Sequence, residues 1–174
     1  MAKTYLTMTN DSAATNSKKW TFSTWVKLGK KASSNQTIVS AGGSSGPYTQ
    51  IKINSDDSLQ IYSSNSFGGS GVTNLKSSRK LYDSAAWYHL VFAFDSTEGT
   101  QSNRLKMWIN NEQVTDFSTN TNAIALNEDN DTMGANAKLQ VVGRFVDSDS
   151  EYFGGTLSQT AFVDGSALTP SSFG

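Results

Sequence analysis

Apolar and polar residues alternate along most of the chain in short segments that recur about every ten residues. A period of two places successive side chains on opposite faces of a strand, whereas a helix repeats its apolar positions every three or four residues. No segment of any length shows the helical repeat. The pattern therefore predicts strands over residues 20–28, 36–41, 48–54, 58–62, 87–94, 105–110, 138–144 and 155–163.

Two of the connections between these segments have the composition of hairpin turns. Residues 54–57 read Asn-Ser-Asp-Asp, and Asn110 and Asn111 separate residues 105–109 from residues 113–117. Asparagine adopts the positive φ angles of a tight turn more readily than most residues that carry a side chain. We therefore expect both connections to join antiparallel neighbours.

Neither face of the predicted strand over residues 87–94 has the polar composition of a solvent-exposed face. Their two faces consist of Trp87, His89, Val91 and Ala93, and of Tyr88, Leu90, Phe92 and Phe94. A strand with both faces covered lies in the middle of a sheet, so we expect residues 87–94 to form a central strand.

Polar linkers over residues 63–70, 118–122 and 127–136 are predicted to be surface loops. Near the end of the sequence, Thr169 followed by Pro170 predicts the start of a short helical turn. The number and spacing of the segments predict an all-β fold, a two-sheet antiparallel jelly-roll sandwich of about a dozen strands.

Composition agrees with this fold and excludes several classes of protein. Ser, Thr and Asn supply 26, 18 and 14 of the 174 residues, and these side chains disfavour helix interiors. The length suits one domain over residues 1–174. The chain has no cysteine, which excludes disulfides and a thiolate nucleophile. Its longest apolar stretches, such as residues 90–94, fall far short of the roughly 20 residues of a membrane-spanning helix.

Charge is distributed unevenly although the net charge is only −1. Residues 1–80 hold ten Lys or Arg against three acids, whereas residues 81–174 hold four against twelve. The two halves either interleave in space and cancel, or form complementary faces that favour packing against a copy or a partner. The basic residues come in isolated pairs, which predicts no binding of nucleic acid.

Five blocks of sequence in this order resemble the laminin G-like, concanavalin A-like jelly-roll domains of tailed-phage virion proteins, marine phages especially. The closing block, with its Asp-Gly, Leu-Thr-Pro and Phe-Gly elements, is the most specific of the five. The blocks are residues 5–7, 18–27, 87–91, 105–110 and 153–174.

The resemblance implies a non-enzymatic structural protein located in the virion. It would decorate the capsid or belong to the tail or fibre apparatus, and it would bind other virion proteins through its β surface. Homo-oligomers are expected. Residues 1–10 would act as a docking arm, and the chain would be either a stand-alone component or a domain of a longer protein.

Asp147, Asp149 and Glu151 follow one another at every second position. Related jelly-roll glucanases place carboxylates at this spacing on one strand, where one is the nucleophile and another the acid. Here the first is Asp, where those enzymes have Glu, and Ser148 and Ser150 replace the apolar residues between them. The segment is therefore interpreted as a solvated turn, and no enzyme is predicted.

Calcium is a second use for these carboxylates, because many laminin G-like domains bind it through loop oxygens. One candidate set is Asp147, Asp149 and Glu151, and the other consists of the acidic residues of the 127–136 linker, Glu128, Asp129 and Asp131. Neither set matches a complete calcium-loop signature. The alternative is that both loops are acidic only because they are solvated.

Glycan binding is the main alternative to a structural role, because a lectin-like site needs only an aromatic platform and hydrogen-bonding neighbours. Alternation places Trp108 beside Lys106 and Asn110, so its ring could face a sugar. Tyr62 and Tyr152, like Tyr48, have polar neighbours of the same kind. The candidate glycan-binding residues are Trp108, Asn110, Tyr62 and Tyr152, and the competing interpretation is that these rings cover the outer face of a sheet.

His89 is the only histidine, so this chain alone cannot supply a histidine-based metal cage. It stands in the middle of a predicted strand between Trp87 and Val91. We expect a core histidine, hydrogen-bonded to its surroundings, and not a catalytic one.

Overall fold

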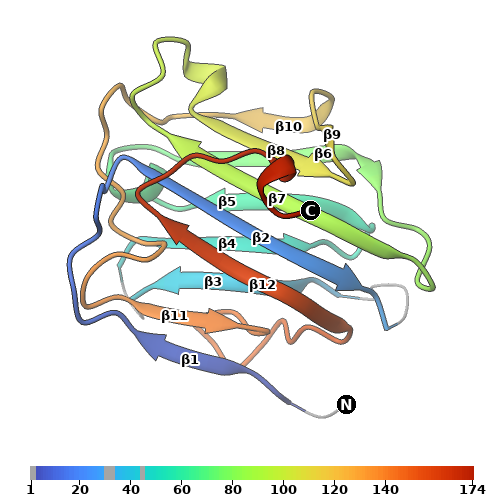
Figure 1. The fold of residues 1–174 in the computed structure, drawn as a ribbon. Coiled ribbons are helices and arrows are strands. Elements are labelled where there is room, and N and C mark those ends of the chain that lie inside the picture. Colours follow the sequence, from blue (N-terminus) through green and yellow to red (C-terminus); the bar gives the residue numbers. More distant parts are fainter. Residues whose placement is uncertain (1–2, 30–33, 44–45) are drawn as a thin grey trace.

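The computed structural model describes residues 3–29, 34–43 and 46–174, and these form two antiparallel sheets packed face to face (Figure 1). The first sheet has seven strands in the order β1-β11-β3-β4-β5-β6-β10, and the second has five in the order β12-β2-β7-β8-β9. The predicted all-β sandwich of about a dozen strands is confirmed. The strands are β1 (Leu6–Thr9), β2 (Lys19–Lys27), β3 (Gln36–Gly42), β4 (Tyr48–Ile53), β5 (Ser58–Ser63), β6 (Thr73–Lys80), β7 (Trp87–Asp95), β8 (Leu105–Ile109), β9 (Glu112–Gln113), β10 (Phe117–Thr121), β11 (Leu139–Val142) and β12 (Thr156–Asp164).

Each predicted strand is present, and four further strands lie at or near the edges of the sheets. These are β1, β6 and β10 in the seven-stranded sheet and the two-residue β9 in the five-stranded sheet. The prediction of a loop over residues 118–122 is wrong, because Phe117–Thr121 pairs with β6. An edge strand needs few apolar residues, so its sequence resembles that of a polar loop.

The core lies between the sheets and is built on a cluster of aromatic rings. Trp20 of β2 stacks on Phe94 of β7 with ring centroids 5.7 Å apart and planes inclined by 10°. Phe67 closes the end of this stack at 5.0 Å from Phe94. It reaches the core from η1 (Ser66–Gly68), a 3-10 turn inside the predicted 63–70 loop, and adopts a φ of 68° there.

The prediction of a central strand at residues 87–94 is confirmed, because β7 pairs with β2 on one side and with β8 on the other. Its even-numbered residues face the core. On the opposite face, Val91 and Ala93 form a small buried cluster with Trp108, and Phe173 packs against it. Phe173 follows η3 (Pro170–Ser172), the short helical turn expected after Thr169, so the C-terminal segment covers part of the outer face of the five-stranded sheet (Figure 1).

Both predicted hairpin turns are confirmed. Asn110 and Asn111 have φ angles of 52° and 67° and join β8 to β9. Residues 54–57 join β4 to β5, with Asp57 at a φ of 63°. The Asn110 side chain adds a tertiary contact, because its Oδ1 accepts a hydrogen bond from the His89 backbone N–H at 2.8 Å.

Gly134 lies in the loop over residues 127–136 and packs closely against Phe162 of β12. It adopts a φ of 68°, and a Cβ built on it would lie 2.3 Å from the Phe162 ring. Replacing Gly134 with alanine will therefore lower the free energy of unfolding by about 2–4 kcal/mol, through backbone strain and overpacking. Chemical denaturation measures this loss. Gly99→Ala is the control, because a Cβ there meets nothing within 4 Å; equal stabilities of the two variants would contradict the packing described.

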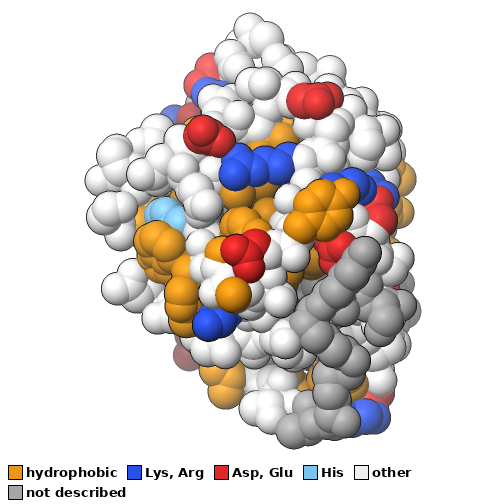
Figure 2. All heavy atoms as spheres, turned by 90° about the vertical axis from the view of Figure 1, so that its right-hand side faces the viewer, with side chains coloured by type: hydrophobic (Ala, Val, Ile, Leu, Met, Phe, Trp, Pro, Cys, Tyr) orange, Lys and Arg blue, Asp and Glu red, His pale blue; other side chains and the backbone are white. Residues whose placement is uncertain are grey.

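The uneven charge of the two halves is cancelled by interleaving, as the first interpretation expected. Ion pairs join bases of the first half to acids of the second, with N···O distances of 2.7 to 2.8 Å. On the face seen in Figure 2, basic, acidic and apolar side chains are likewise interspersed. Three examples at these distances are Lys18–Asp129, Lys19–Asp95 and Arg79–Glu112.

Part of the predicted N-terminal docking arm is built into the fold. Leu6–Thr9 pairs with β11 as the edge strand of the seven-stranded sheet. Residues 1 and 2 lie outside the described part of the chain. In that described part, no helix is long and apolar enough to cross a membrane.

Candidate functional site

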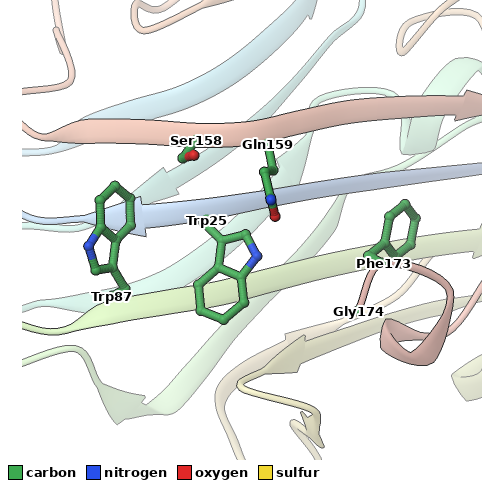
Figure 3. A pocket seen from close by; sticks show the side chains of 6 residues that line it. All are labelled: Trp25, Trp87, Ser158, Gln159, Phe173 and Gly174. Atoms are coloured by element: carbon green, nitrogen blue, oxygen red, sulfur yellow. The ribbon is translucent and has the colours of Figure 1, made fainter.

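The outer face of the five-stranded sheet brings two tryptophans together. Trp25 lies on β2 and Trp87 on the adjacent β7, and their rings stand near one another on the same face (Figure 3). In the sheet register, Trp25 is opposite His89 and Trp87 is opposite Lys27. The Trp87 side chain is 40% exposed, so its ring is available to a ligand.

These rings line a pocket of about 480 Å³ that opens to the surface. A neighbouring hollow of about 340 Å³ shares Trp25, Gln159 and Phe173 and continues along the sheet toward Ser23 and His89. The first pocket therefore combines aromatic surfaces with hydrogen-bonding groups. Its lining residues are Trp25, Trp87, Ser158, Gln159, Phe173 and Gly174.

A bulge in β12 supplies the polar wall. The pairing of β12 with β2 shifts between Ser158 and Ala161, and Gln159 adopts a φ of 49° at this point. An extra residue in a strand reverses the alternation beyond it. Gln159 therefore reaches the pocket next to Ser158, while the Thr160 hydroxyl lies 2.8 Å from that of Thr24.

His89 supports one side of the Trp25 ring. The two rings stack with centroids 4.8 Å apart and planes inclined by 13°. His89 Nε2 and the Ser23 hydroxyl share a hydrogen bond of 2.9 Å, and the imidazole is buried. Burial lowers the pKa of His89, and the side chain of Asn111 partly opposes this shift. His89 is thus a hydrogen-bonded, buried histidine, as expected.

Acidification will destabilise the protein through His89. The unfolded chain takes up a proton near about pH 6.5, whereas the buried imidazole of the folded chain does so only at lower pH. The contribution of neutral His89 to the free energy of unfolding is complete above the pKa that His89 has in the unfolded chain. It is lost as the pH falls from there through the pKa that His89 has in the folded chain. On acidification, the free energy of unfolding will therefore fall more steeply for the wild type than for His89→Gln. The difference between the two slopes is at most about 1.4 kcal/mol per pH unit. Denaturation at a series of pH values tests this, and parallel pH profiles would contradict it.

The four residues predicted to bind a glycan do not converge on one site. Trp108 shares the sheet of the pocket, but only 7% of it is exposed, because it packs with Val91 and Ala93. Asn110 lies in the neighbouring turn. Tyr62 lies on the other sheet, where it stacks on Tyr48 with ring centroids 5.6 Å apart. Tyr152 lies in the loop after β11, where its ring contacts that of Tyr5. Trp108 therefore covers the outer face of the five-stranded sheet, as the competing interpretation expects.

Asp147, Asp149 and Glu151 lie in the connection from β11 to β12 and not on a strand, which agrees with the predicted turn. Glu151 is held against the seven-stranded sheet, where its Oε2 accepts hydrogen bonds from Gln50 at 2.5 Å and from the Thr37 hydroxyl at 3.2 Å. Asp149 pairs instead with Lys3 at 2.9 Å. Burial raises the pKa of Asp147.

The second acidic set is also divided among separate partners. Glu128 accepts a hydrogen bond from the Ala125 backbone N–H, Asp129 pairs with Lys18, and Asp131 pairs with Lys138. Within residues 3–29, 34–43 and 46–174, no three His, Asp or Glu side chains are grouped closely enough to hold a metal ion. The structure thus does not bring either predicted calcium set together.

A family model described as "Concanavalin A-like lectin/glucanases superfamily" matches residues 1–172. The chain belongs to this superfamily. The expected laminin G-like, concanavalin A-like domain is therefore confirmed, while its origin in a phage stays a prediction. A search of the curated proteins found no match to the chain.

Several solved structures share this fold at low sequence identity. The carbohydrate-binding module CBM40 of the Ruminococcus gnavus IT-sialidase, bound to α2,3-sialyllactose, has a TM-score of 0.59 and 12% identity over 90% of this chain and 81% of its own. Domain 4 of the Geobacillus stearothermophilus arabinanase AbnA, in complex with arabinotriose, has a TM-score of 0.58 and 23% identity over 90% and 65%. Domains LG4-5 of the mouse laminin α1 chain have a TM-score of 0.62 and 11% identity over 94% and 42%. At these identities the likeness shows the fold alone.

The sequence contains a signal for Trp25, although this residue is not among the predicted glycan-binding residues. Trp25 shares its strand face with Thr21, Ser23 and Lys27, so it is an aromatic residue on an otherwise polar face. The pattern of residues 87–94 predicts a covered face for Trp87, whereas the residue is 40% exposed. Gln159 has no comparable signal, because its position depends on the bulge.

Proposed function

We propose that this chain is a non-catalytic carbohydrate-binding domain that holds a sugar in the pocket over Trp25 and Trp87. The observation that carries the proposal is the pair of tryptophan rings beside the hydroxyl of Ser158 and the amide of Gln159. The apolar C–H face of a sugar ring packs on an indole, and its hydroxyls exchange hydrogen bonds with side-chain amides and hydroxyls. A preformed sheet holds the aromatic groups in place before the ligand arrives.

The composition of the pocket favours binding over hydrolysis. Glycoside hydrolysis uses two carboxyl groups on either side of the scissile bond. Among the described residues, no Asp or Glu lines the pocket. Glu151, one of the carboxylates predicted from strand spacing, lies instead against the seven-stranded sheet and is already hydrogen-bonded there. The carbohydrate-binding modules among the structural neighbours support the same reading.

A glycan array probed with the labelled chain tests the proposal. We expect at least one glycan to bind, and titration calorimetry should then give a saturable isotherm with a single site. A chain that is folded by circular dichroism and binds none of a broad set of neutral and acidic glycans would overturn the proposal.

The place of the domain in a phage particle stays a prediction from the sequence resemblance, together with virion proteins as partners and self-association. It is compatible with glycan binding, because a module of a tail fibre or other attachment apparatus would use both. Labelling intact particles with an antibody against the domain would test this placement, and particles without label would contradict it.

A further inference from the structure

We infer that the sugar bound at this pocket carries an anionic group, a carboxylate or a sulfate ester, and that Lys27 receives it. This inference rests on the proposed function and adds the charge class of the ligand. It follows from where Lys27 lies and from the absence of a competing carboxylate around it in the described part of the chain.

Lys27 is the last residue of β2 and belongs to the outer face of the sheet. It is directly opposite Trp87 in the register and two residues after Trp25. Side chains that stand opposite one another in an antiparallel pair have Cβ atoms roughly 5 Å apart. The ammonium group of Lys27 can therefore reach a substituent of a sugar that stacks on Trp87.

The other lysines on this face have acidic neighbours. Lys19 pairs with Asp95 at 2.8 Å, and Lys106 lies 3.8 Å from Glu98. Among residues 3–29, 34–43 and 46–174, no carboxylate oxygen lies within 4.0 Å of the Lys27 ammonium nitrogen, so Lys27 forms no ion pair there. Its charge is thus available to a ligand.

The described lining of the pocket adds no negative side chain that would cancel this charge, because none of its residues is Asp or Glu. Gly174 lies at the far end of the pocket from Trp87, beyond Trp25 (Figure 3). Lys27 is not itself among the lining residues, but its place opposite Trp87 puts its charge next to the end of the pocket beside that ring. A sugar stacked on Trp87 with an anionic substituent toward Lys27 satisfies both features at once.

The test compares matched ligands against two lysine variants. The acidic probes are galacturonate, glucuronate, sialyllactose and galactose 6-sulfate, and their neutral parents are galactose, glucose and lactose. We expect an acidic probe to bind about three- to tenfold more tightly than its parent. Lys27→Gln should remove this preference and Lys27→Arg should keep it, and Lys106→Gln is the control on the same face. Carboxylate and sulfate probes separate the two sources of charge.

The outcomes distinguish this inference from the proposed function. Equal binding of acidic probes and neutral parents, unchanged in Lys27→Gln but lost in Trp87→Ala, would overturn the anionic ligand and leave glycan binding intact. Failure of every glycan to bind would overturn both. The inference would be supported if the protein with Lys27 prefers acidic probes and raised ionic strength reduces this preference, while Lys27→Gln shows no such salt effect.

Discussion

Replacing Trp87 with alanine will weaken glycan binding by roughly tenfold to a hundredfold, and replacing Trp25 will have a similar effect. Burial of a large aromatic surface contributes about 1.5–3 kcal/mol, which corresponds to this range of affinity. Trp87 is 40% exposed in the free protein, so its ring has surface left to bury against a ligand. Titration calorimetry with the best glycan of the array measures the loss.

Tyr62→Ala is the matched control for both tryptophan variants. Tyr62 is also a partly exposed ring on an outer face, but it lies on the seven-stranded sheet and stacks on Tyr48. Its removal should leave the affinity unchanged. If Tyr62→Ala loses binding while Trp25→Ala and Trp87→Ala retain it, the ligand binds the opposite sheet and the site is wrong.

The largest effect on stability is expected at Trp20. The side chain is 1% exposed and contacts the rings of Phe67, Phe94 and Phe162. Truncation of a buried aromatic residue to alanine costs about 3–5 kcal/mol, because transfer free energy is lost and a cavity remains. A domain of this size has a total stability of about 5–15 kcal/mol. Trp20→Ala should therefore lower the denaturation midpoint severely, and a loss below about 1 kcal/mol would contradict the described core.

Trp20→Phe separates the packing of this residue from its polar atom. The indole Nε1 is buried and no acceptor of the described residues hydrogen-bonds to it. Burial of an unsatisfied donor costs about 1–3 kcal/mol, so phenylalanine removes a penalty while it loses some volume. We expect Trp20→Phe to destabilise the protein by less than half as much as Trp20→Ala, as measured by denaturation in guanidinium chloride.

Alternation was sufficient to predict the interior strands and the fold class. β7 could be identified as central because both of its faces are unsuited to water, and one of them indeed packs under Phe173. The edge strand β10 has the sequence of a loop, because its residues Phe117–Thr121 are mostly polar and its place depends on pairing with β6. Such pairing is a tertiary property that local composition does not report.

The candidate site was less predictable than the fold. Trp108 and Trp25 have similar surroundings in the sequence, yet Phe173 packs against the cluster that buries Trp108, while Trp25 lines the pocket. That difference depends on where the C-terminal segment crosses the sheet. Gln159 reaches the pocket only because β12 bulges, and a one-residue shift of register moves a side chain to the other face.

The most direct measurement of the central claim follows the four indole N–H signals of the protein by NMR during titration with the bound glycan. Trp25 and Trp87 line the pocket, whereas Trp20 and Trp108 are buried away from solvent. We predict that two indole signals, assigned to Trp25 and Trp87 through their alanine variants, will shift to saturation while the other two stay in place. Saturable binding that leaves both of these signals unmoved would contradict the account.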